Sequence, residues 1–495
     1  MGRCWPGWKN LRCGAVLTAT LAACGTSSSA DRFQVLADTI ESERQTLGVP
    51  GVAAAVIENG KVTFARGFGT RDPNGNAPVK PSTLFRIGSC TKALTAIAVL
   101  QQVQQGKVSL DAPLVSYVPD FHLDGGSPSW TSSITVRQLL DHTSGISDYL
   151  EVNAPPAERD DGALERFLTG RFAGVGYLQY PPGAFYAYSN SNYMLAGLVA
   201  ERTSGVPYRD LMRGSVLRPL GMERTFFTPA EVLADGDYAI GRTCSTGSPG
   251  AACSSPATVA PDAYDNPWGR PAGYAWSSVL DLARLAAFLV HGADDVVTSD
   301  LRNAMLTSQV NTHLDGDIVG YGFGMTVGQG FLLGSPAMFY RAKTLSHDGA
   351  IPGFTASIAC APDLDFCFIT LANGDGAAFS RSLVTALGTL THLPPPSAAP
   401  DVAPDPARYS AYAGDYVDAH VVGAVQVSAA GGKLSVSVPE LDQAGAGYTH
   451  ELTPTTLDNF TMQVNGETWA LTFLADESGV YRYLRGDRLV AVRTP

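Results

Sequence analysis

The hydrophobic pattern begins with one helix and one hairpin. Apolar residues at helical spacing predict a helix over 33–47. Two strand-like runs follow, 52–57 and 62–67, and Asn59-Gly60 lies between them. An Asn-Gly pair between two such runs is typical of a tight hairpin turn. The pattern therefore predicts two antiparallel strands directly after the first helix.

Later in the chain the periodicity is mostly helical and then returns to strands. Helical spacing dominates from about 111 to 309, and strands are predicted near 320–327, at 355–360 and at 366–372, before a helix over 382–390. Strands at both ends with helices between them favour the α+β class. We expect an antiparallel β-sheet flanked by helices, with an α-helical subdomain, completed when the chain returns.

The segment 85–105 has too many apolar residues for a surface helix and is expected to form a central, buried one. Ser89 lies at its start and Lys92 follows one turn later, so the amine can reach the hydroxyl on the same helix face. This places a nucleophile beside a candidate base. A serine three residues before a lysine is common by chance, so the pair alone decides nothing.

The C-terminal part has a different character. Residues 393–408 are rich in proline and nearly free of large apolar residues, which predicts a semi-rigid linker. Residues 409–495 contain short alternating runs separated by Gly, Asn and Asp turns. This pattern predicts a small all-β barrel or sandwich. No nucleophile and base are paired in it.

Composition narrows the possible functions. The chain has 495 residues, of which 45% are hydrophobic and 16% are charged, and a net charge of −12. Its length suits two or three domains. A negative chain with no basic cluster argues against nucleic-acid binding, which requires a positive surface.

The N-terminus resembles an export signal. Arg3, Lys9 and Arg12 precede a weakly apolar run that is too short to span a bilayer. The run ends in Leu21-Ala22-Ala23-Cys24, which looks like a bacterial lipoprotein signal. In this interpretation the signal peptide is 1–24 and ends at Cys24, which would carry the lipid, and 25–32 would form a polar tether. An ordinary cleaved signal is the alternative. Both interpretations predict export, and the first predicts a protein anchored to the membrane of the cell envelope.

Four cysteines form two close pairs in the exported part. Cys244 and Cys253 bracket a Ser/Gly/Pro-rich loop, while Cys360 and Cys367 flank a short turn between two predicted strands. In an exported chain both pairs are expected to form disulfides. Metal binding is the rival interpretation, but the cysteine spacing is too wide and the histidines are scattered, so no metal site is expected.

Two further motifs complete a resemblance to a known family. Tyr188-Ser189-Asn190 precedes a predicted helix, and His347-Asp348-Gly349 lies on or beside a predicted strand. With Ser89-Cys90-Thr91-Lys92 they resemble the ordered motifs of the serine β-lactamase and penicillin-binding protein superfamily. Segments 134–146, 216–227 and 273–282 are also similar to its scaffold, and His142 within the first is expected to be structural.

The resemblance covers about 33–392 and implies a β-lactamase-like serine hydrolase domain. The branch that this domain most resembles contains class C β-lactamases, D-Ala-D-Ala carboxypeptidases, D-aminopeptidases and esterases. It implies an acyl-enzyme at Ser89, with Lys92 or Tyr188 as the base. Asn190, His347 and Gly349 would contact substrate, and the backbone N–H groups of Ser89 and Ala350 would form the oxyanion hole. No cofactor is implied. Residues 409–495 resemble the lipocalin-like barrels that some relatives append.

The third motif departs from the pattern of enzymes that bind β-lactams well. Those enzymes carry lysine where this chain has His347, which is mostly neutral at pH 7. The expected substrate is therefore a short-chain ester or a D-amino-acid-containing peptide. A β-lactamase or D,D-carboxypeptidase is the runner-up, and an envelope binding protein with a relic active site is the non-enzymatic alternative. The oligomeric state stays open.

Overall fold

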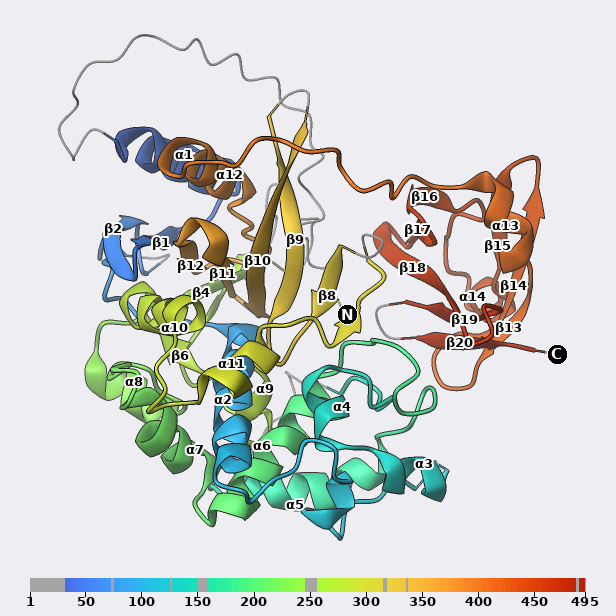
Figure 1. Cartoon of the computed structure of the whole chain (residues 1–495), viewed down its shortest axis with the longest axis horizontal. Coiled ribbons are helices and arrows are strands. Elements are labelled where there is room, and N and C mark those ends of the chain that lie inside the picture. The colour runs from blue at the N-terminus through green and yellow to red at the C-terminus, as the bar shows by residue number, and fades with distance from the viewer. Residues whose placement is uncertain are drawn as a thin grey trace.

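The computed structural model confirms an α+β fold with a separate C-terminal β domain. It describes residues 32–72, 75–124, 127–149, 158–244, 256–314, 318–334, 337–486 and 489–494. The larger domain is built on an eight-stranded sheet with the order β2-β1-β12-β11-β10-β9-β8-β7 (Figure 1). The neighbouring strands of this sheet are antiparallel, as expected.

The first helix and hairpin form as predicted. Helix α1 spans Gln34–Thr46, and strands β1 (Gly51–Glu58) and β2 (Lys61–Gly69) pair antiparallel. Asn59 and Gly60 both have positive φ, 51° and 67°, which a two-residue turn between twisted strands requires. This local signal was enough to fix the hairpin.

The chain's return completes the sheet. Strand β10 (Met338–Ile351) is followed by β11 (Phe354–Ala361) and β12 (Phe366–Ala372). Strand β12 pairs with β1 along its whole length, from Val52 opposite Ala372 to Glu58 opposite Phe366. The two ends of the domain therefore share one sheet.

One predicted strand is interrupted in the structure. The run 320–327 is divided between β8 (Val319–Tyr321) and β9 (Thr326–Leu333), which pair with each other. Gly324 in the turn between them has φ of +78°, and a Cβ there would lie 2.8 Å from the carbonyl oxygen of Lys92. The turn packs against the backbone of the buried helix, a tertiary contact that periodicity does not reveal.

Helices cover both faces of the sheet. Helix α12 (Ser380–Leu390) packs beside α1 on one face, as Figure 1 shows at the top. Helix α10 (Val279–His291) packs on β1, β2 and β12 on the other face, where α2 (Thr91–Gln104) runs through the helical subdomain. Residues 90–102 are all buried, which confirms the expected central helix.

The other elements of this domain are mostly short, apart from α6. The helices are α3 (Pro128–Ser133), α4 (Val136–Leu140), α5 (Ala163–Thr169), α6 (Asn190–Ser204), α7 (Tyr208–Leu211), α8 (Pro229–Asp235), α9 (Arg270–Gly273) and α11 (Ser299–Met305). The 3₁₀ or π turns are η2 (Gly88–Cys90), η3 (Leu114–Ser116), η4 (Arg171–Gly174), η5 (Met212–Leu217), η6 (Pro267–Gly269) and η7 (Pro362–Leu364). The strands are β3 (Phe85–Arg86), β4 (Gly241–Cys244), β5 (Pro256–Val259), β6 (Trp276–Ser277) and β7 (Val310–Asn311).

The C-terminal domain is a curled eight-stranded sheet, called the barrel below and drawn in orange to red in Figure 1. Its strands are β13 (Gly414–Asp418), β14 (Gly423–Ala430), β15 (Lys433–Ser437), β16 (Thr453–Thr456), β17 (Asn459–Val464), β18 (Glu467–Ala475), β19 (Tyr481–Arg485) and β20 (Val490–Arg493), with η8 (Pro406–Arg408), α13 (Tyr409–Tyr412) and α14 (Pro439–Gln443). The segment 448–452 bonds to β15 and to Gln463 of β17. It thereby links the edge strand β15 to β17, which lies next to the opposite edge. Apolar side chains fill the interior.

The predicted linker is held at two points. The amide of Ser397 donates to the carbonyl of Phe339 on β10, over 2.9 Å, and the amide of Leu457 in the barrel donates to the carbonyl of Val402, over 2.8 Å. The segment therefore contacts both domains as it passes between them.

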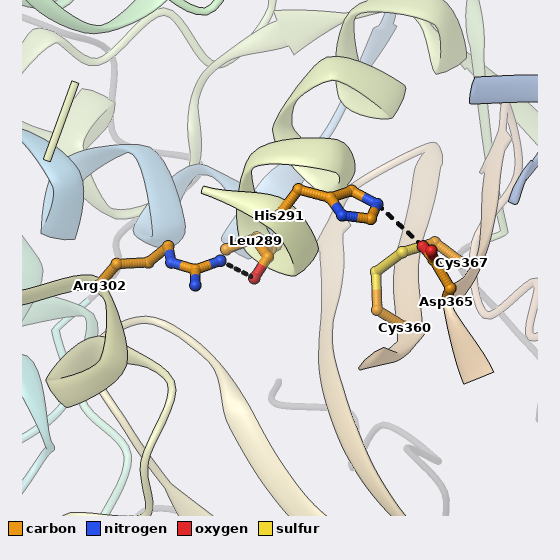
Figure 2. Close-up of a disulfide and its surroundings, with 6 residues drawn as sticks. All are labelled: Leu289, His291, Arg302, Cys360, Asp365 and Cys367. Carbon is orange, nitrogen blue, oxygen red and sulfur yellow. Dashed lines mark hydrogen bonds and ion pairs between the residues drawn. A yellow bond between two sulfur atoms is a disulfide. The ribbon is translucent and has the colours of Figure 1, made fainter. Parts of the chain in front are cut away.

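The disulfide predicted between Cys360 and Cys367 is confirmed (Figure 2). The two residues face each other in the β11–β12 register, with Cα atoms 4.0 Å apart. Asp365 in the same turn adopts φ of +48° and its Oδ1 lies 2.9 Å from Nε2 of His291 on α10. The turn is thus joined both across the strands and to the helix.

Some predictions fall on residues that the structure does not describe. Cys24, with the signal 1–24, and Cys253 lie outside the described residues, so lipidation and the Cys244–Cys253 bridge stay predictions. Among the described helices, none has both the length and the apolar character needed to cross a bilayer.

Candidate active site

Ser89 lies in the turn η2 at the start of α2. Of residues 83–102, Ser89 is the one that is not buried. The preceding Gly88 has φ of +50°, and a Cβ there would lie 2.5 Å from the amide nitrogen of Ala350 on β10. Glycine thus lets the turn press against the strand while the serine hydroxyl stays accessible at the positive end of the helix.

Lys92 is fully buried, and its amine makes three contacts. Nζ lies 3.0 Å from Oγ of Ser89, 2.7 Å from Oδ1 of Asn190 and 2.6 Å from the carbonyl oxygen of Ala272. Both carbonyl oxygens can only accept, so a neutral amine uses its two N–H groups on them. Its lone pair is then left for the proton of the Ser89 hydroxyl.

The protonation of Lys92 suits this arrangement. Burial lowers the pKa of Lys92 to about 7, while the charge of Asp148 acts in the opposite direction. Near neutral pH a large fraction of the amine is therefore unprotonated. An unprotonated amine at this position is able to accept the Ser89 proton.

Tyr188 approaches the same oxygen from the other side. Its phenol donates to Oγ of Ser89 over 2.8 Å, and the Lys92 amine lies 4.8 Å from the centre of its ring. Burial raises the pKa of Tyr188 well above its usual value, and the hydrogen bond to Ser89 opposes this only in part. The phenol is therefore a proton donor in the resting site.

Asn190, the first residue of α6, joins Lys92 to a residue that the sequence did not identify. Its backbone N–H and side-chain NH₂ both donate to Oδ1 of Asp148, over 2.7 and 3.0 Å. The carboxylate fixes the amide orientation, so that Oδ1 of Asn190 faces Lys92. Asp148 lies two residues beyond the scaffold segment 134–146, and its position there was the only available signal.

His347 on β10 is buried and held at both ring nitrogens. Nδ1 donates to the carbonyl of Asp348 over 2.7 Å, so the neutral ring accepts at Nε2 from the hydroxyl of Tyr321, 3.0 Å away. Burial, and to a lesser extent the charge of Lys92, lowers the pKa of His347 to about 3. The residue supplies no cation to the site near neutral pH.

The two segments of the expected oxyanion hole lie against each other. A Cβ on Gly349 would come within 1.9 Å of the carbonyl oxygen of Ile87 and 3.1 Å of the amide nitrogen of Ser89. Only glycine permits this close approach of β10 to η2. The backbone of Ala350 is thereby brought to the turn that carries Ser89.

His142 lies beneath Tyr188, with ring centres 4.4 Å apart. Its Nδ1 accepts from the amide of Ser189 and lies 3.2 Å from the side-chain amide of Asn192. Burial holds the pKa of His142 well below its usual range. The neutral ring therefore packs against Tyr188 and accepts a hydrogen bond from the next residue, Ser189.

The C-terminal barrel contacts the segment that leads into Tyr188. Arg485 on β19 is buried and donates to the carbonyl of Tyr186 and, over 2.8 Å, to the carbonyl of Thr312. Leu474 and Val490 of the barrel pack with Tyr180 and Phe185 of the larger domain. The barrel is thus a neighbour of the site, which its strand pattern alone did not indicate.

No candidate for a metal centre emerges from the described part of the chain. There, His, Cys, Asp and Glu nowhere gather in groups of three or more that could hold an ion.

Comparisons with known proteins give consistent results. The model of the family described as Beta-lactamase matches residues 36–392. Protein flp of Staphylococcus aureus (strain N315) is 27% identical over 343 residues, which are 69% of this chain and 63% of that protein. Unguisins hydrolase ungD' of Aspergillus campestris (strain IBT 28561) is 29% identical over 349 residues, 68% and 61%. The chain thus spans less than two thirds of these curated relatives.

A solved structure extends the similarity in fold to both domains. The crystal structure of SurE superposes with a TM-score of 0.66 at 24% identity, and the match covers 94% of this chain and 99% of that one. Because the identity is low, this likeness concerns the fold.

Proposed function

Since the chain belongs to the β-lactamase family, whose model matches residues 36–392, we propose that it is a serine hydrolase that cleaves an ester or amide through an acyl-enzyme at Ser89. The observation that carries this proposal is the hydrogen bonding of Lys92. The carbonyl oxygens of Asn190 and Ala272 can only accept hydrogen bonds, so they use both N–H groups of the neutral amine. The lone pair of the amine is therefore left for the Ser89 hydroxyl.

The reaction follows from these contacts. Oγ of Ser89 attacks the substrate carbonyl carbon as its proton moves to Nζ of Lys92. The backbone N–H groups of Ser89 and Ala350 hold the resulting oxyanion. The phenol of Tyr188 gives a proton to the leaving group as the C–O or C–N bond breaks, and it regains one from the Lys92 ammonium. Water then attacks the acyl-enzyme and releases the acid.

The preferred substrates are short-chain esters and D-amino-acid-containing peptides. The neutral state of His347 supports this choice, because a substrate carboxylate finds no cation there. β-Lactams and peptidoglycan stem peptides are the runner-up substrates. A relic site in a binding protein is a weaker candidate, because the Ser89, Lys92 and Tyr188 contacts are those of a reactive serine.

We also propose that the protein is exported and lipid-anchored through Cys24, on the strength of the basic and apolar N-terminal residues. Metabolic labelling with a palmitate analogue tests this proposal. Label should appear in the full chain and disappear in Cys24→Ala, and a label that persists in the variant would reject the anchor.

The test of the catalytic proposal uses protein starting at Asp31, with Ser89→Ala beside it. Initial rates are compared on p-nitrophenyl butyrate, D-alanyl p-nitroanilide and a chromogenic cephalosporin. Fast turnover of the ester or the anilide that vanishes in Ser89→Ala supports the proposal. A dominant rate on the cephalosporin would favour the runner-up. Failure of a fluorophosphonate probe to label Ser89 would support the binding protein.

A further inference from the structure

We propose that Thr95 is a positioning residue for the reaction. Its hydroxyl binds the carbonyl of Pro271 and thereby holds the next carbonyl, that of Ala272, on the amine of Lys92. The inference rests on the proposed function and deepens it, because it names what keeps the lone pair of Lys92 directed at Ser89.

The first step concerns how α9, the four-residue helix that contains Ala272, is held. It packs against α2, and Oγ1 of Thr95 on α2 lies 2.7 Å from the carbonyl oxygen of Pro271. One turn earlier on α2, Oγ1 of Thr91 accepts from the backbone N–H of Ala275 over 3.3 Å. Two threonines of α2 thus hold the chain on both sides of Ala272.

The second step concerns the direction of the hydrogen bonds at Thr95, which is fully buried. Its hydroxyl carries one proton, and the carbonyl of Pro271 can only accept, so Thr95 donates to it. The phenol of Tyr208, 2.7 Å from the same Oγ1, is therefore a donor to Thr95. Burial raises the pKa of Tyr208 above its usual value, which keeps the phenol protonated. The carbonyl of Thr91 is a more distant neighbour of the hydroxyl, at 3.4 Å.

The third step concerns what the Ala272 carbonyl does for Lys92. While the carbonyls of Ala272 and Asn190 occupy both N–H groups of the neutral amine, its lone pair faces Ser89. If the Ala272 carbonyl recedes, an N–H group can turn to Ser89 and the lone pair is no longer held there. The ammonium loses more than the neutral amine, because a hydrogen bond from a charged donor is about twice as strong. The rate and the pKa of Lys92 should therefore both fall.

The other titratable groups around the Lys92 amine make no hydrogen bond to Thr95 among the described residues. They are Cys90, His142, Asp148, Tyr188, Tyr193 and His347. Their effects on Lys92 are the same with and without the Thr95 hydroxyl. A change in the titration of Lys92 in a Thr95 variant therefore reports on the Ala272 carbonyl.

The test uses Thr95→Val, which keeps the shape of the side chain and removes the hydroxyl. Hydrolysis of p-nitrophenyl butyrate from about pH 5 to about pH 9 gives the plateau and the midpoint of kcat/KM. We expect the plateau to fall about tenfold, because the base is less well oriented. The midpoint should move down by about 0.5 to 1 pH unit, the difference between a charged and a neutral hydrogen bond. Thr95→Ser keeps the hydroxyl and should retain both values.

Thr203→Val is the matched control, because it removes a hydroxyl that bonds to the carbonyl of Val199 on α6, over 2.7 Å. It should change neither the plateau nor the midpoint. Thr95→Val leaves the buried carbonyl of Pro271 and the phenol of Tyr208 without their partner. If that variant does not fold, Thr95→Cys takes its place, since its thiol is a weak donor and should give a smaller change in the same direction.

Two results would overturn the inference while leaving the proposed function intact. One is a Thr95→Val protein whose plateau is unchanged, or whose midpoint stays or moves upward, which assigns the hydroxyl to packing alone. The other is a Thr95→Ser protein that behaves like Thr95→Val, since the hydroxyl would then not be the cause. Absence of Ser89-dependent turnover of the ester in the unaltered protein would reject the proposed function together with this inference.

Discussion

Two buried basic side chains, Lys92 in the active site and Arg485 between the domains, have similar hydrogen-bond partners but different roles. Lys92 donates to the carbonyl oxygens of Ala272 and Asn190, and Arg485 donates to the backbone carbonyls of Tyr186 and Thr312. An amine can lose a proton when buried, whereas a guanidinium stays charged. The same kind of environment therefore yields a base at Lys92 and a fixed connection at Arg485.

The connection at Arg485 matters because of its position. Tyr186 lies two residues before Tyr188, and its carbonyl is the one that the guanidinium binds. Tyr180 and Phe185 on the same segment pack against Leu474 and Val490. The barrel thereby restrains the backbone that delivers the Tyr188 phenol to Ser89.

The largest effect is expected from replacing the titratable cation. Lys92→Met removes the base and should lower kcat/KM by about 1000-fold or more, within the range for a general base that also supports the nucleophile. The free energy of unfolding at pH 7 should stay the same or rise by up to about 3 kcal/mol, because a buried amine with a lowered pKa is itself destabilising.

Hydrolysis of p-nitrophenyl butyrate and urea unfolding measure the two quantities for Lys92→Met. Lys107→Met makes the same substitution on an exposed side chain and should leave both unchanged. A large loss of stability in Lys92→Met would mean that the lysine is a structural cation like Arg485, and the contrast between them would fail.

A smaller effect is expected at the domain interface. Arg485→Met leaves the carbonyls of Tyr186 and Thr312 without their donor, so we expect a loss of about 2 kcal/mol in the free energy of unfolding. The Tyr188 segment should then be held less well, and kcat should fall about tenfold with little change in KM.

Arg482→Met is the matched control for Arg485→Met, since it changes an exposed arginine on the same strand β19. The rate of fluorophosphonate labelling of Ser89 gives a second readout. If Arg485→Met unfolds more easily but labels at the normal rate, the barrel stabilises the protein without positioning Tyr188.

Local signals in the sequence predicted much of the fold. Asn59-Gly60 fixes a hairpin because its conformation depends on those two residues and on the adjoining strands. A strand was predicted at 320–327, but its interruption was not. The chain turns at Gly324 because it packs there against the carbonyl of Lys92, which is far away in the sequence. Periodicity describes which face is apolar, and it carries no information about such contacts.

The residues of the candidate site also divide into those that the sequence identified and those that it did not. Ser89, Lys92 and Tyr188 could be chosen from ordered motifs, and the structure brings them together. Asp148 and Arg485 could not, because a lone aspartate or arginine in a chain with many charges has no distinguishing pattern. Even for Lys92, the direction of the lone pair depends on the carbonyl of Ala272, which any residue could supply.

The smallest expected effect is the pH dependence of kcat/KM, which should depend on the titration of Lys92 and not on Arg485. Neutral Lys92 is the active form and its pKa is about 7, so kcat/KM should rise about tenfold from pH 6 to pH 8 and then level off. His347, with a pKa of about 3, stays neutral across this range. Arg485→Met should lower the whole curve without moving its midpoint, because arginine does not titrate there.

Asp148→Asn should move that midpoint to lower pH. The charge of Asp148 raises the pKa of Lys92 against the effect of burial, so its removal favours the neutral amine at lower pH. Profiles measured with neutral p-nitrophenyl butyrate avoid the titration of a substrate amine. A midpoint that moves upward, or that moves in Arg485→Met instead, would show that the group that titrates is not Lys92.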